Sequence, residues 1–421
     1  MKSKPDGTSS TTMVINATNV GRYLDGISVY TLNILRELAG LQTHLRFIIY
    51  VNRACAGHLE KIRFGDNCSV RWIGESVSPD HGFRGQFLRL LVAQWISWKH
   101  RAIPLFAASQ LESAFFRRRQ VIMVHDVIPY LFRRWHKKQY YFFRLCLPFI
   151  LKKAQAIITP SYHTQGLLQQ VFGVSETKLH VIPNGIQREF HPPAKSSVHQ
   201  RENFILFTGR IAPMKNLKGL LKAFSMIQHL IPHTLVIVGY GKTHRTKLLS
   251  PENLASLKID SQRVVIKGSV STMELSELYR RAAMVMVPSF YEGFGLPPLE
   301  AMASGCPVVA SNVSSIPEVC GDSVYYVDPY VPYSIALGMR RVLENPGLKE
   351  QLVARGLKQA SYFNWRKSAE CHLSIFQRVA EECIPERMPK QVRPPAPMFT
   401  PGLLHRVHRD PALAMIDVHA K

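Results

Sequence analysis

The sequence contains no apolar run long enough to cross a membrane. No stretch of the 421 residues approaches the ~20 uninterrupted apolar residues that a spanning helix needs. The opening residues, MKSKPDGTSSTTMVINAT, also lack the apolar core of a secretory signal. We therefore expect a cytoplasmic protein, with at most peripheral contact at the inner face of the cytoplasmic membrane.

Cysteine is scarce and shows no pairing pattern. The seven cysteines include no CxxC pair and lie at positions 55, 68, 146, 306, 320, 371 and 383. Secreted domains that depend on disulfides have denser, even-numbered sets of cysteines. The pattern predicts free thiols in a reducing compartment.

Acidic residues are also few, with 29 Asp and Glu against 53 Lys and Arg, which gives a formal net charge of +24. Such an excess attracts polyanions or anionic membrane surfaces. Nucleic acid is not favoured as the partner, because the sequence has no zinc-ligand spacing and no aromatic RNA-binding signature. The excess instead predicts a cationic cleft for phosphates, together with a basic face that contacts anionic lipid.

The first half of the chain alternates between short apolar runs and helical patterns, which is typical of a parallel α/β sheet. Strands are predicted at 13–18, 47–51, 70–73, 120–126 and 156–161. Helices are predicted at 27–38, 84–99, 137–153 and 163–172. After a polar leader at 1–12, residues 13–190 are therefore expected to form a doubly wound, Rossmann-like domain.

A second α/β series follows a turn-rich, proline-containing linker at 191–202. Its strands are predicted at 204–209, 234–239, 264–268, 284–288, 307–311 and 324–328, within a domain spanning 203–365. Beyond it we expect a helix at 366–383 that returns toward the first domain, and a flexible, basic, Pro-rich tail at 384–421. Two such sheets create a cleft, and ligands of open α/β sheets bind beyond the carboxyl ends of the strands.

The stretch Ser289-Phe-Tyr-Glu-Gly-Phe-Gly-Leu-Pro-Pro-Leu-Glu300 combines a glycine-containing loop with a predicted helix start at Pro297. Backbone N–H groups at a helix start suit a pyrophosphate. Glu292 and Glu300 supply carboxylates, each of which accepts two hydroxyl hydrogen bonds. One carboxylate can therefore hold a sugar ring and the other a ribose diol.

Upstream, Thr208-Gly-Arg-Ile-Ala-Pro-Met-Lys-Asn216 places Arg210 and Lys215 in the loop after the first strand of the second domain. Two cations at that position can neutralise a bound diphosphate, a task that a divalent metal performs at other phosphate sites.

These motifs resemble the signature of the family 4 retaining glycosyltransferases, group 1, which have the GT-B fold. The likeness rests on Glu292 and Glu300, separated by seven residues inside EGFGLPPLEAMASGCPVVAS, with the Arg-Lys loop upstream. It implies two Rossmann-like domains facing across a cleft, and a site that needs no metal and no other cofactor. It also implies that a nucleotide-sugar donor contacts a set of residues in the second domain: Arg210, Lys215, Glu292, Gly293, Phe294, Gly295, Leu296 and Glu300.

In the first domain the resemblance singles out His125 and Gly26. A lone histidine at a strand end is as often structural as functional, but similar enzymes carry a histidine here that contacts the donor sugar or shapes the acceptor site. The loop Leu24–Val29 resembles the family's glycine loop below the donor phosphates, although Asp25 stands before Gly26 where paired glycines are usual. We predict Glu292, His125, Arg210 and Lys215 as the catalytic set.

The resulting expectation is a hexosyltransferase, with mannose from GDP-mannose as the donor group and a polysaccharide or lipid-linked oligosaccharide as acceptor. The pathway expected is bacterial cell-surface or exopolysaccharide biosynthesis. Two enzyme alternatives on this fold stay open: a nucleotide-sugar epimerase, and a phosphorylase, for which no lysine that binds pyridoxal phosphate is evident. A non-catalytic module that binds polyanions or membranes is the alternative from another class.

Basic and aromatic residues cluster at 83–101. This segment is predicted either to lie on an anionic bilayer, with Trp95 and Trp98 at the interface, or to be an ordinary helix packed on the sheet. The membrane hypothesis assigns lipid contact to Arg84, Arg89 and Lys99.

Overall fold

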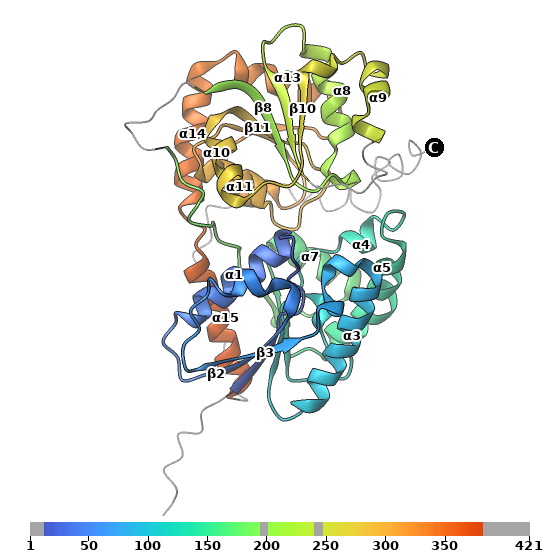
Figure 1. The fold of residues 1–421 in the computed structure, drawn as a ribbon, viewed down its shortest axis with the longest axis vertical. Helices are drawn as coiled ribbons and strands as arrows, with labels where there is room; N and C mark the ends of the chain where they lie inside the picture. Colours follow the sequence, from blue (N-terminus) through green and yellow to red (C-terminus); the bar gives the residue numbers. More distant parts are fainter. Residues whose placement is uncertain (1–11, 194–200, 240–246, 382–421) are drawn as a thin grey trace, which may run out of the picture. The chain divides into compact units, whose positions relative to one another are not determined.

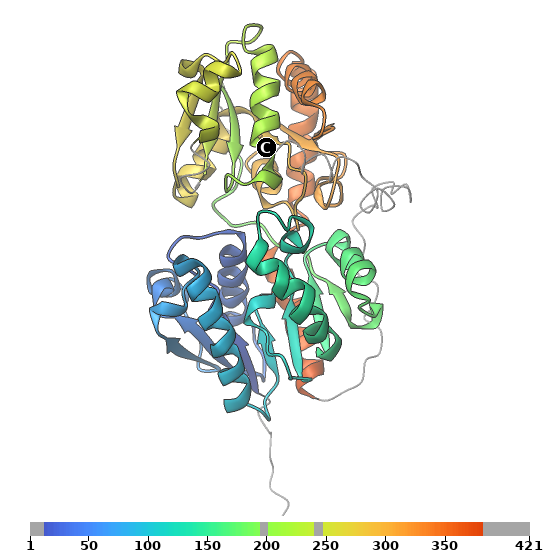
Figure 2. The same cartoon turned by 90° about the vertical axis from the view of Figure 1, so that its right-hand side faces the viewer.

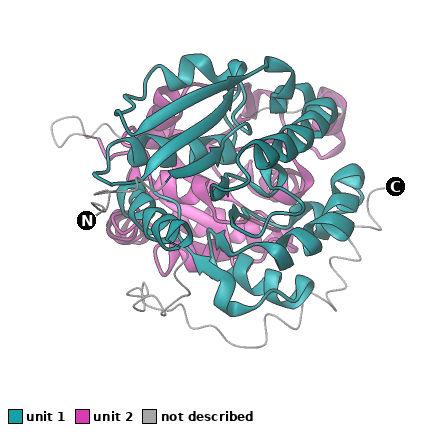
Figure 3. Cartoon of the chain, turned by 90° about the horizontal axis from the view of Figure 1, so that it is seen from below, with its two compact units in different colours: residues 1–185, 364–389 teal, residues 186–363, 390–421 magenta. Residues whose placement is uncertain are grey.

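The computed structural model describes residues 12–193, 201–239 and 247–381. These residues fall into two compact units, coloured separately in Figure 3. Unit 1 comprises residues 12–185 and 364–381, and unit 2 comprises residues 186–363. The boundary between the units, at residues 185 and 186, precedes the predicted linker at 191–202. Residues 194–200 of that linker lie outside the described residues. The leader up to residue 11 and the predicted tail at 384–421 lie outside them as well.

Unit 1 is built on a parallel sheet of seven strands in the order β3-β2-β1-β4-β5-β6-β7 (Figure 1). The strands are β1 (Thr12–Asn16), β2 (Arg46–Asn52), β3 (Cys68–Ile73), β4 (Leu105–Ala107), β5 (Gln120–Met123), β6 (Ala156–Thr159) and β7 (Leu179–Val181). Five of them correspond to predicted strands. β4 and β7 were not predicted, because three residues are too few to show a period.

The helices of unit 1 are α1 (Gly26–Ala39), α2 (Ala56–Leu59), α3 (Gly82–Lys99), α4 (Ile128–Leu131), α5 (Lys137–Tyr141), α6 (Leu147–Lys153), α7 (Tyr162–Phe172) and α15 (Trp365–Ala380). The helix predicted at 137–153 is not continuous. A π-helical turn at Phe142–Cys146 separates α5 from α6. Pro148 explains the interruption, since it has no N–H to donate to the carbonyl four residues earlier and its ring crowds that carbonyl.

Both faces of the centre of this sheet are covered, which explains why β4, β5 and β6 are buried along their whole length, whereas the edge strand β3 is partly exposed. Met13 and Ile15 of β1 pack into a core shared with α1 and α15, whereas Val14 packs on the other side with Ile96 of α3. Helix α15 follows unit 2 in the sequence, yet its Phe376 is fully buried in the unit 1 core.

Unit 2 has a parallel sheet of six strands in the order β10-β9-β8-β11-β12-β13. The strands are β8 (Glu202–Thr208), β9 (Thr234–Val238), β10 (Val264–Lys267), β11 (Ala282–Val287), β12 (Val308–Ser311) and β13 (Tyr325–Val327). The helices are α8 (Leu217–Ile227), α9 (Pro251–Ser256), α10 (Thr272–Arg281), α11 (Leu296–Ala303), α12 (Ile316–Cys320), α13 (Pro332–Leu343) and α14 (Pro346–Ala360). Alternate residues of each central strand enter one of two cores, one with α8 and α13 and the other with α10 and α11.

None of the helices in the described ranges is long and apolar enough to cross a membrane.

The carboxyl ends of β8 and β9 approach each other closely. A Cβ atom added at Gly239 would lie 1.9 Å from the carbonyl oxygen of Gly209. The amide of Gly209 donates to Val238 O at 3.0 Å, so the sheet ladder continues to this point. The two glycines therefore set the position from which the loop after β8 departs.

We expect Gly239→Ala to lower the free energy of unfolding by ~1–3 kcal/mol, because the new methyl group overlaps a backbone atom that has no free space to move into. Urea denaturation monitored by circular dichroism measures the change. Gly268→Ala is the matched control, since a Cβ there meets nothing within 4 Å. Equal stability losses in the two variants would show that the close approach is not the cause.

Candidate functional site

The candidate site lies at the switch point of the unit 2 sheet. Strand β8 has β9 on one side and β11 on the other. The loops after β8 and β11 therefore diverge at the carboxyl edge, which is where open α/β sheets bind ligands. Both motifs singled out in the second half of the sequence begin in these two loops, and the second motif continues into α11.

The loop after β8 is tied to its neighbours by Asn216. This residue has a left-handed backbone (φ 56°) and caps α8 by accepting the amide of Gly219 at 3.1 Å. Its side-chain amide donates to Pro288 O at 3.0 Å and to Pro329 O at 2.7 Å. Asn216 thus fixes Lys215, its neighbour, against the loop after β11.

Lys215 and Glu292 form an ion pair that connects the two loops. The Nζ atom of Lys215 lies 2.6 Å from both carboxylate oxygens of Glu292. The hydroxyl of Ser289 donates to Oε1 of the same carboxylate at 2.7 Å. Glu292 is only 6% exposed, so this charge is compensated where water has little access.

The pair leaves some hydrogen-bonding capacity open. A lysine ammonium has three N–H donors, and two of them point to Glu292. Oε1 of Glu292 accepts from both Lys215 and Ser289, whereas Oε2 accepts only from Lys215 among the contacts that the structure gives it. One donor on Lys215 and one acceptor position on Oε2 therefore have no partner among the described residues.

Two serines hold the backbone around Glu292. The amide of Glu292 donates to the hydroxyl of Ser314 at 3.0 Å. The hydroxyl of Ser315 donates to the carbonyls of Glu292 and Phe294 at 2.9 and 2.8 Å. Ser314 has a left-handed backbone (φ 59°), which is uncommon for a residue with a side chain and is found where surrounding contacts enforce it.

The start of α11 offers fewer amides than its position suggests. Gly295 caps the helix with φ 111°, and Pro297 and Pro298 occupy its first turn without N–H groups. The amide of Leu299 donates to Gly295 O. Donors for an anion must therefore come from the turn at Phe294, Gly295 and Leu296, whose amides have no protein acceptor in the described part of the chain.

Glu300 lies one turn into α11, beside the ion pair. Its Oε2 accepts from the Tyr279 hydroxyl at 3.1 Å, and Tyr279 is linked to Thr208 at 2.9 Å. Burial raises the pKa of Glu300 to about 7, although the Tyr279 hydrogen bond and the charge of Lys215 both act to lower it. The structure therefore brings Lys215, Glu292 and Glu300 together, with Glu300 close to its titration point at neutral pH.

Arg210 lies in the same loop as Lys215 and is exposed. It has no ion pair or hydrogen bond to any other described residue. Since Glu292 offsets the charge of Lys215, Arg210 is the cation of this site that is left uncompensated.

Several residues that support this site were not among the predicted site residues: Thr208, Asn216, Tyr279, Ser289, Ser314 and Ser315. Thr208, Asn216 and Ser289 lie inside the two motifs, so their position was a signal that could have been used. Tyr279, Ser314 and Ser315 lie on other elements, and no local pattern marks them.

In unit 1 His125 is buried and uncharged. It follows β5, is 7% exposed, and donates from Nε2 to Ala108 O at 2.9 Å, since a carbonyl can only accept. Its ring meets Tyr30 edge-on with centroids 4.7 Å apart. Burial lowers the pKa of His125 to about 4, opposed by the Ala108 hydrogen bond and by the charge of Asp25. His125 therefore lies near the start of α1, where Gly26 is located.

The loop before α1 departs from a simple glycine turn. Asp25 is the N-cap of α1, and its carboxylate accepts from both the amide and the hydroxyl of Ser28 at 2.9 Å. The Asp25 carboxylate accepts the Ser28 amide, so this amide is not available to bind a phosphate at the helix start. The negative charge of Asp25 would also repel an anion there. Gly26, the first residue of the helix, is exposed beside it.

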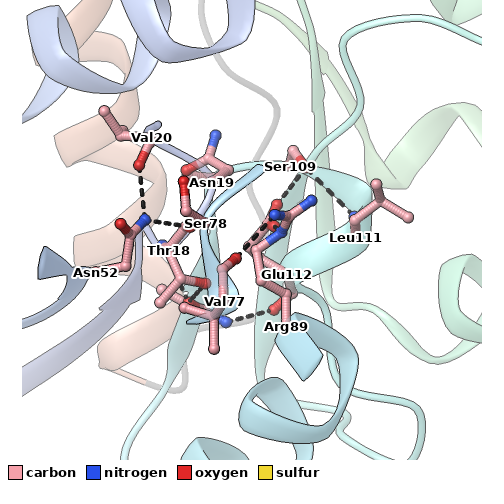
Figure 4. A network of polar contacts seen from close by, with 12 residues as sticks. Thr18, Asn19, Val20, Asn52, Val77, Ser78, Arg89, Ser109, Leu111 and Glu112 are labelled. Atoms are coloured by element: carbon pink, nitrogen blue, oxygen red, sulfur yellow. Dashed lines mark hydrogen bonds and ion pairs between the residues drawn. The ribbon is translucent and has the colours of Figure 1, made fainter. Parts of the chain in front are cut away.

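A buried polar network lies at the switch point of the unit 1 sheet, between β1 and β4 (Figure 4). Asn52 donates to the carbonyls of Thr18 and Val20 at 2.9 and 2.6 Å. Arg89 of α3 donates to Val77 O at 2.9 Å and pairs with Glu112 at 2.9 Å. Arg89 is 5% exposed, so its predicted contact with lipid is wrong: a nearby buried carboxylate draws this cation inward.

Solved structures of similar fold define the class. Sucrose-phosphate synthase from Thermosynechococcus elongatus has a TM-score of 0.70 at 20% identity, covering 88% of this chain and 100% of that one. Anabaena HepE in complex with UDP and glucose has a TM-score of 0.67 at 18% identity, covering 87% and 99%. The chain has the GT-B fold predicted from its sequence, with a doubly wound parallel sheet in each half.

Sequence relatives identify the family. Residues 24–190 match the family "Glycosyltransferase Family 4", and residues 191–359 match "Glycosyl transferases group 1". O-antigen chain mannosyltransferase B of Escherichia coli is 31% identical over 376 residues, covering 84% of this chain and 96% of that protein. O-antigen chain mannosyltransferase RfbU of Salmonella typhimurium is 27% identical over 333 residues, covering 75% and 87%. The chain belongs to the group 1 glycosyltransferases of family 4.

The raised pKa of Glu300 predicts a pH-dependent stability. Its carboxyl group binds a proton more tightly in the folded than in the unfolded chain, so its contribution is fully present below about pH 4.5 and is lost as pH rises through about 7. Relative to Glu300→Gln, the wild type should lose on the order of 2–3 kcal/mol of unfolding free energy between pH 5 and pH 8. Urea midpoints of both proteins across this range measure it. A difference that does not change with pH would contradict the assignment.

Proposed function

We propose that this glycosyltransferase moves a sugar, mannose from GDP-mannose, onto a growing polysaccharide or lipid-linked oligosaccharide, with retention of the anomeric configuration. The observation that supports it most is the Lys215–Glu292 pair at the switch point of unit 2, with Glu300 and Arg210 next to it. The relatives named as O-antigen mannosyltransferases support mannose and bacterial surface polysaccharide biosynthesis.

In this proposal each charged group has one task. Arg210 and the third N–H of Lys215 neutralise the diphosphate, together with the amides of Phe294, Gly295 and Leu296. Glu292 accepts a hydroxyl of the transferred sugar on Oε2, and Glu300 accepts the ribose hydroxyls. Since these protein cations and amides supply the compensation, the proposed chemistry needs no divalent metal.

Retention is proposed to occur on the front face of the sugar. The leaving diphosphate takes the proton of the acceptor hydroxyl as the new glycosidic bond forms and the old bond to phosphate breaks. This route needs no covalent intermediate, and Glu292, the carboxylate assigned to the sugar, already accepts from Lys215 and Ser289. His125, uncharged and donating to Ala108, is proposed to shape the acceptor side rather than to move a proton.

Donor binding tests the site first. A donor at a hundred times its dissociation constant should raise the unfolding free energy by roughly 2.7 kcal/mol. Thermal shifts with GDP-, UDP- and ADP-sugars should show one nucleotide class that stabilises the wild type. Lys215→Ala should lose the shift because the diphosphate loses a cation. Lys222→Ala, an exposed lysine of α8, is the matched control. If all three nucleotide classes leave the wild type unchanged, the donor site proposed here is wrong.

Transfer itself is tested with labelled GDP-mannose and a mannose-terminated oligosaccharide acceptor. We expect a product with the same anomeric configuration as the donor, read from the proton–carbon coupling of the new linkage by NMR. Glu292→Gln should lower turnover by ~10²-fold or more, since a charged hydrogen-bond acceptor at the reacting sugar is lost. Conversion of the donor without any acceptor would instead indicate an epimerase.

A further inference from the structure

Two neighbouring segments of unit 1 carry large apolar side chains that face solvent. On α3 they recur at intervals of four or three residues and are 42–74% exposed: Phe83, Phe87, Leu91, Trp95 and Trp98. On the segment 137–153 they recur every four residues and are 40–67% exposed: Tyr141, Leu145 and Phe149. This spacing gathers such residues on one face of a helix. We call these eight residues the apolar stripes.

Contacts at both ends place the two segments side by side. Lys138 Nζ of α5 lies 4.1 Å from the ring centroid of Phe83, at the start of α3. At the other end the amide of Phe115 donates to Gln94 of α3 at 2.9 Å, and the Phe116 ring lies 5.7 Å from that of Phe149. Figure 2 shows the two segments next to each other on one side of unit 1. The two stripes therefore lie on neighbouring segments of unit 1.

Charge of one sign is concentrated in the same part of the chain. Residues 82–175 contain fourteen Lys and Arg and two acidic residues, Glu112 and Asp126. The difference, 14 − 2 = 12, is half of the formal charge of +24. Glu112 is buried against Arg89, and Asp126 accepts the amide of Ile128 at the carboxyl end of β5. No carboxylate of this segment therefore lies on the α3 or 137–153 helices that form the surface.

A basic hollow adjoins the stripes at the amino ends of β5, β6 and β7. It has a volume of about 550 Å³ and is lined by Arg118, Lys152, Lys153, Ala154, Gln155 and Lys178, with four cations and no carboxylate. Lys153 Nζ also lies 5.2 Å from the ring centroid of Phe149, so the hollow and the stripes share a border.

The arginines on either side of Arg118 donate to backbone carbonyls at helix ends, whereas Arg118 does not. Arg117 donates to Ser97 O and His100 O at the end of α3, at 2.8 and 2.9 Å. Arg119 donates to Ala380 O at the end of α15, at 3.1 Å. Arg118, between them, is exposed in the hollow and donates to no acceptor among the residues described.

We propose that this surface rests on an anionic phospholipid bilayer, with the apolar stripes in the interfacial layer and a lipid phosphate in the hollow at Arg118, Lys152, Lys153 and Lys178. Aromatic and aliphatic side chains enter the boundary between headgroups and acyl chains, while lysine and arginine attract anionic headgroups. Nucleic acid would pair with the cations but would leave Leu91 and Leu145 in water. A bilayer satisfies both features at once, and the inference does not depend on the donor or linkage proposed above.

Vesicle flotation of the full-length protein tests this. We expect binding to vesicles of phosphatidylcholine mixed with phosphatidylglycerol, little binding to phosphatidylcholine alone, and weaker binding at high salt. The triple variant Arg118→Glu, Lys152→Glu, Lys153→Glu should bind ~tenfold or more weakly. The triple variant Phe87→Ser, Trp98→Ser, Leu145→Ser should also lose binding. Its residues are 53–74% exposed, so folding should be preserved.

The matched control is Lys222→Glu, Arg341→Glu, Lys358→Glu, three exposed cations of unit 2 with the same change in net charge. It should bind like the wild type, and an equal loss would overturn the proposal in favour of diffuse charge attraction. Stabilisation by inorganic phosphate without vesicle binding would show a site for free phosphate instead. A lipid-free dimer that the Ser variant abolishes would show that a second copy covers the stripes. Either result overturns the bilayer assignment.

Discussion

The ion pair between Lys215 and Glu292 is the interaction on which the unit 2 site depends. It joins two loops whose residues are 77 positions apart in the chain, and it compensates a carboxylate that is 6% exposed. Losing one partner of such a buried pair costs ~3–5 kcal/mol, because the other charge is left without compensation. Asn216, Ser289, Ser314 and Ser315 can be understood as the supports of this pair. Each fixes either a loop backbone or a carboxylate oxygen at this site.

The two units differ in how their polar groups are paired at the switch point of the sheet. In both, the sheet order reverses at a central strand and the loops beyond it diverge. In unit 1 the space is filled by a polar network in which Arg89, Glu112 and Asn52 are bonded to protein groups. In unit 2 the polar groups are only partly used by the protein, and Arg210 has no partner among the described residues. Ligand-binding capacity at a switch point is therefore set by which polar groups the protein leaves unsatisfied.

The basic character of the chain has two structural origins. In unit 2 a few cations gather at a site where carboxylates balance part of their charge, which suits recognition of one small anion. In unit 1 many cations border exposed aromatic side chains with no carboxylate among them, which suits a broad anionic surface. Net charge alone does not distinguish these arrangements, because it contains no information about which charges are paired.

Sequence alone determined the two α/β domains, most strands, and the loops that carry Arg210, Lys215, Glu292 and Glu300. These follow from local causes: apolar periodicity, turn glycines and prolines near helix starts. Tertiary structure decided the short strands β4 and β7, the π turn before α6, and the partners of buried charges. The sequence pattern predicted that Arg89 contacts lipid, whereas in the structure Arg89 is buried and pairs with Glu112. Tyr279 donates to Glu300, but no local sequence motif identified it as part of the site. A buried charge takes the partner that the fold brings within reach, and that partner comes from a distant part of the chain.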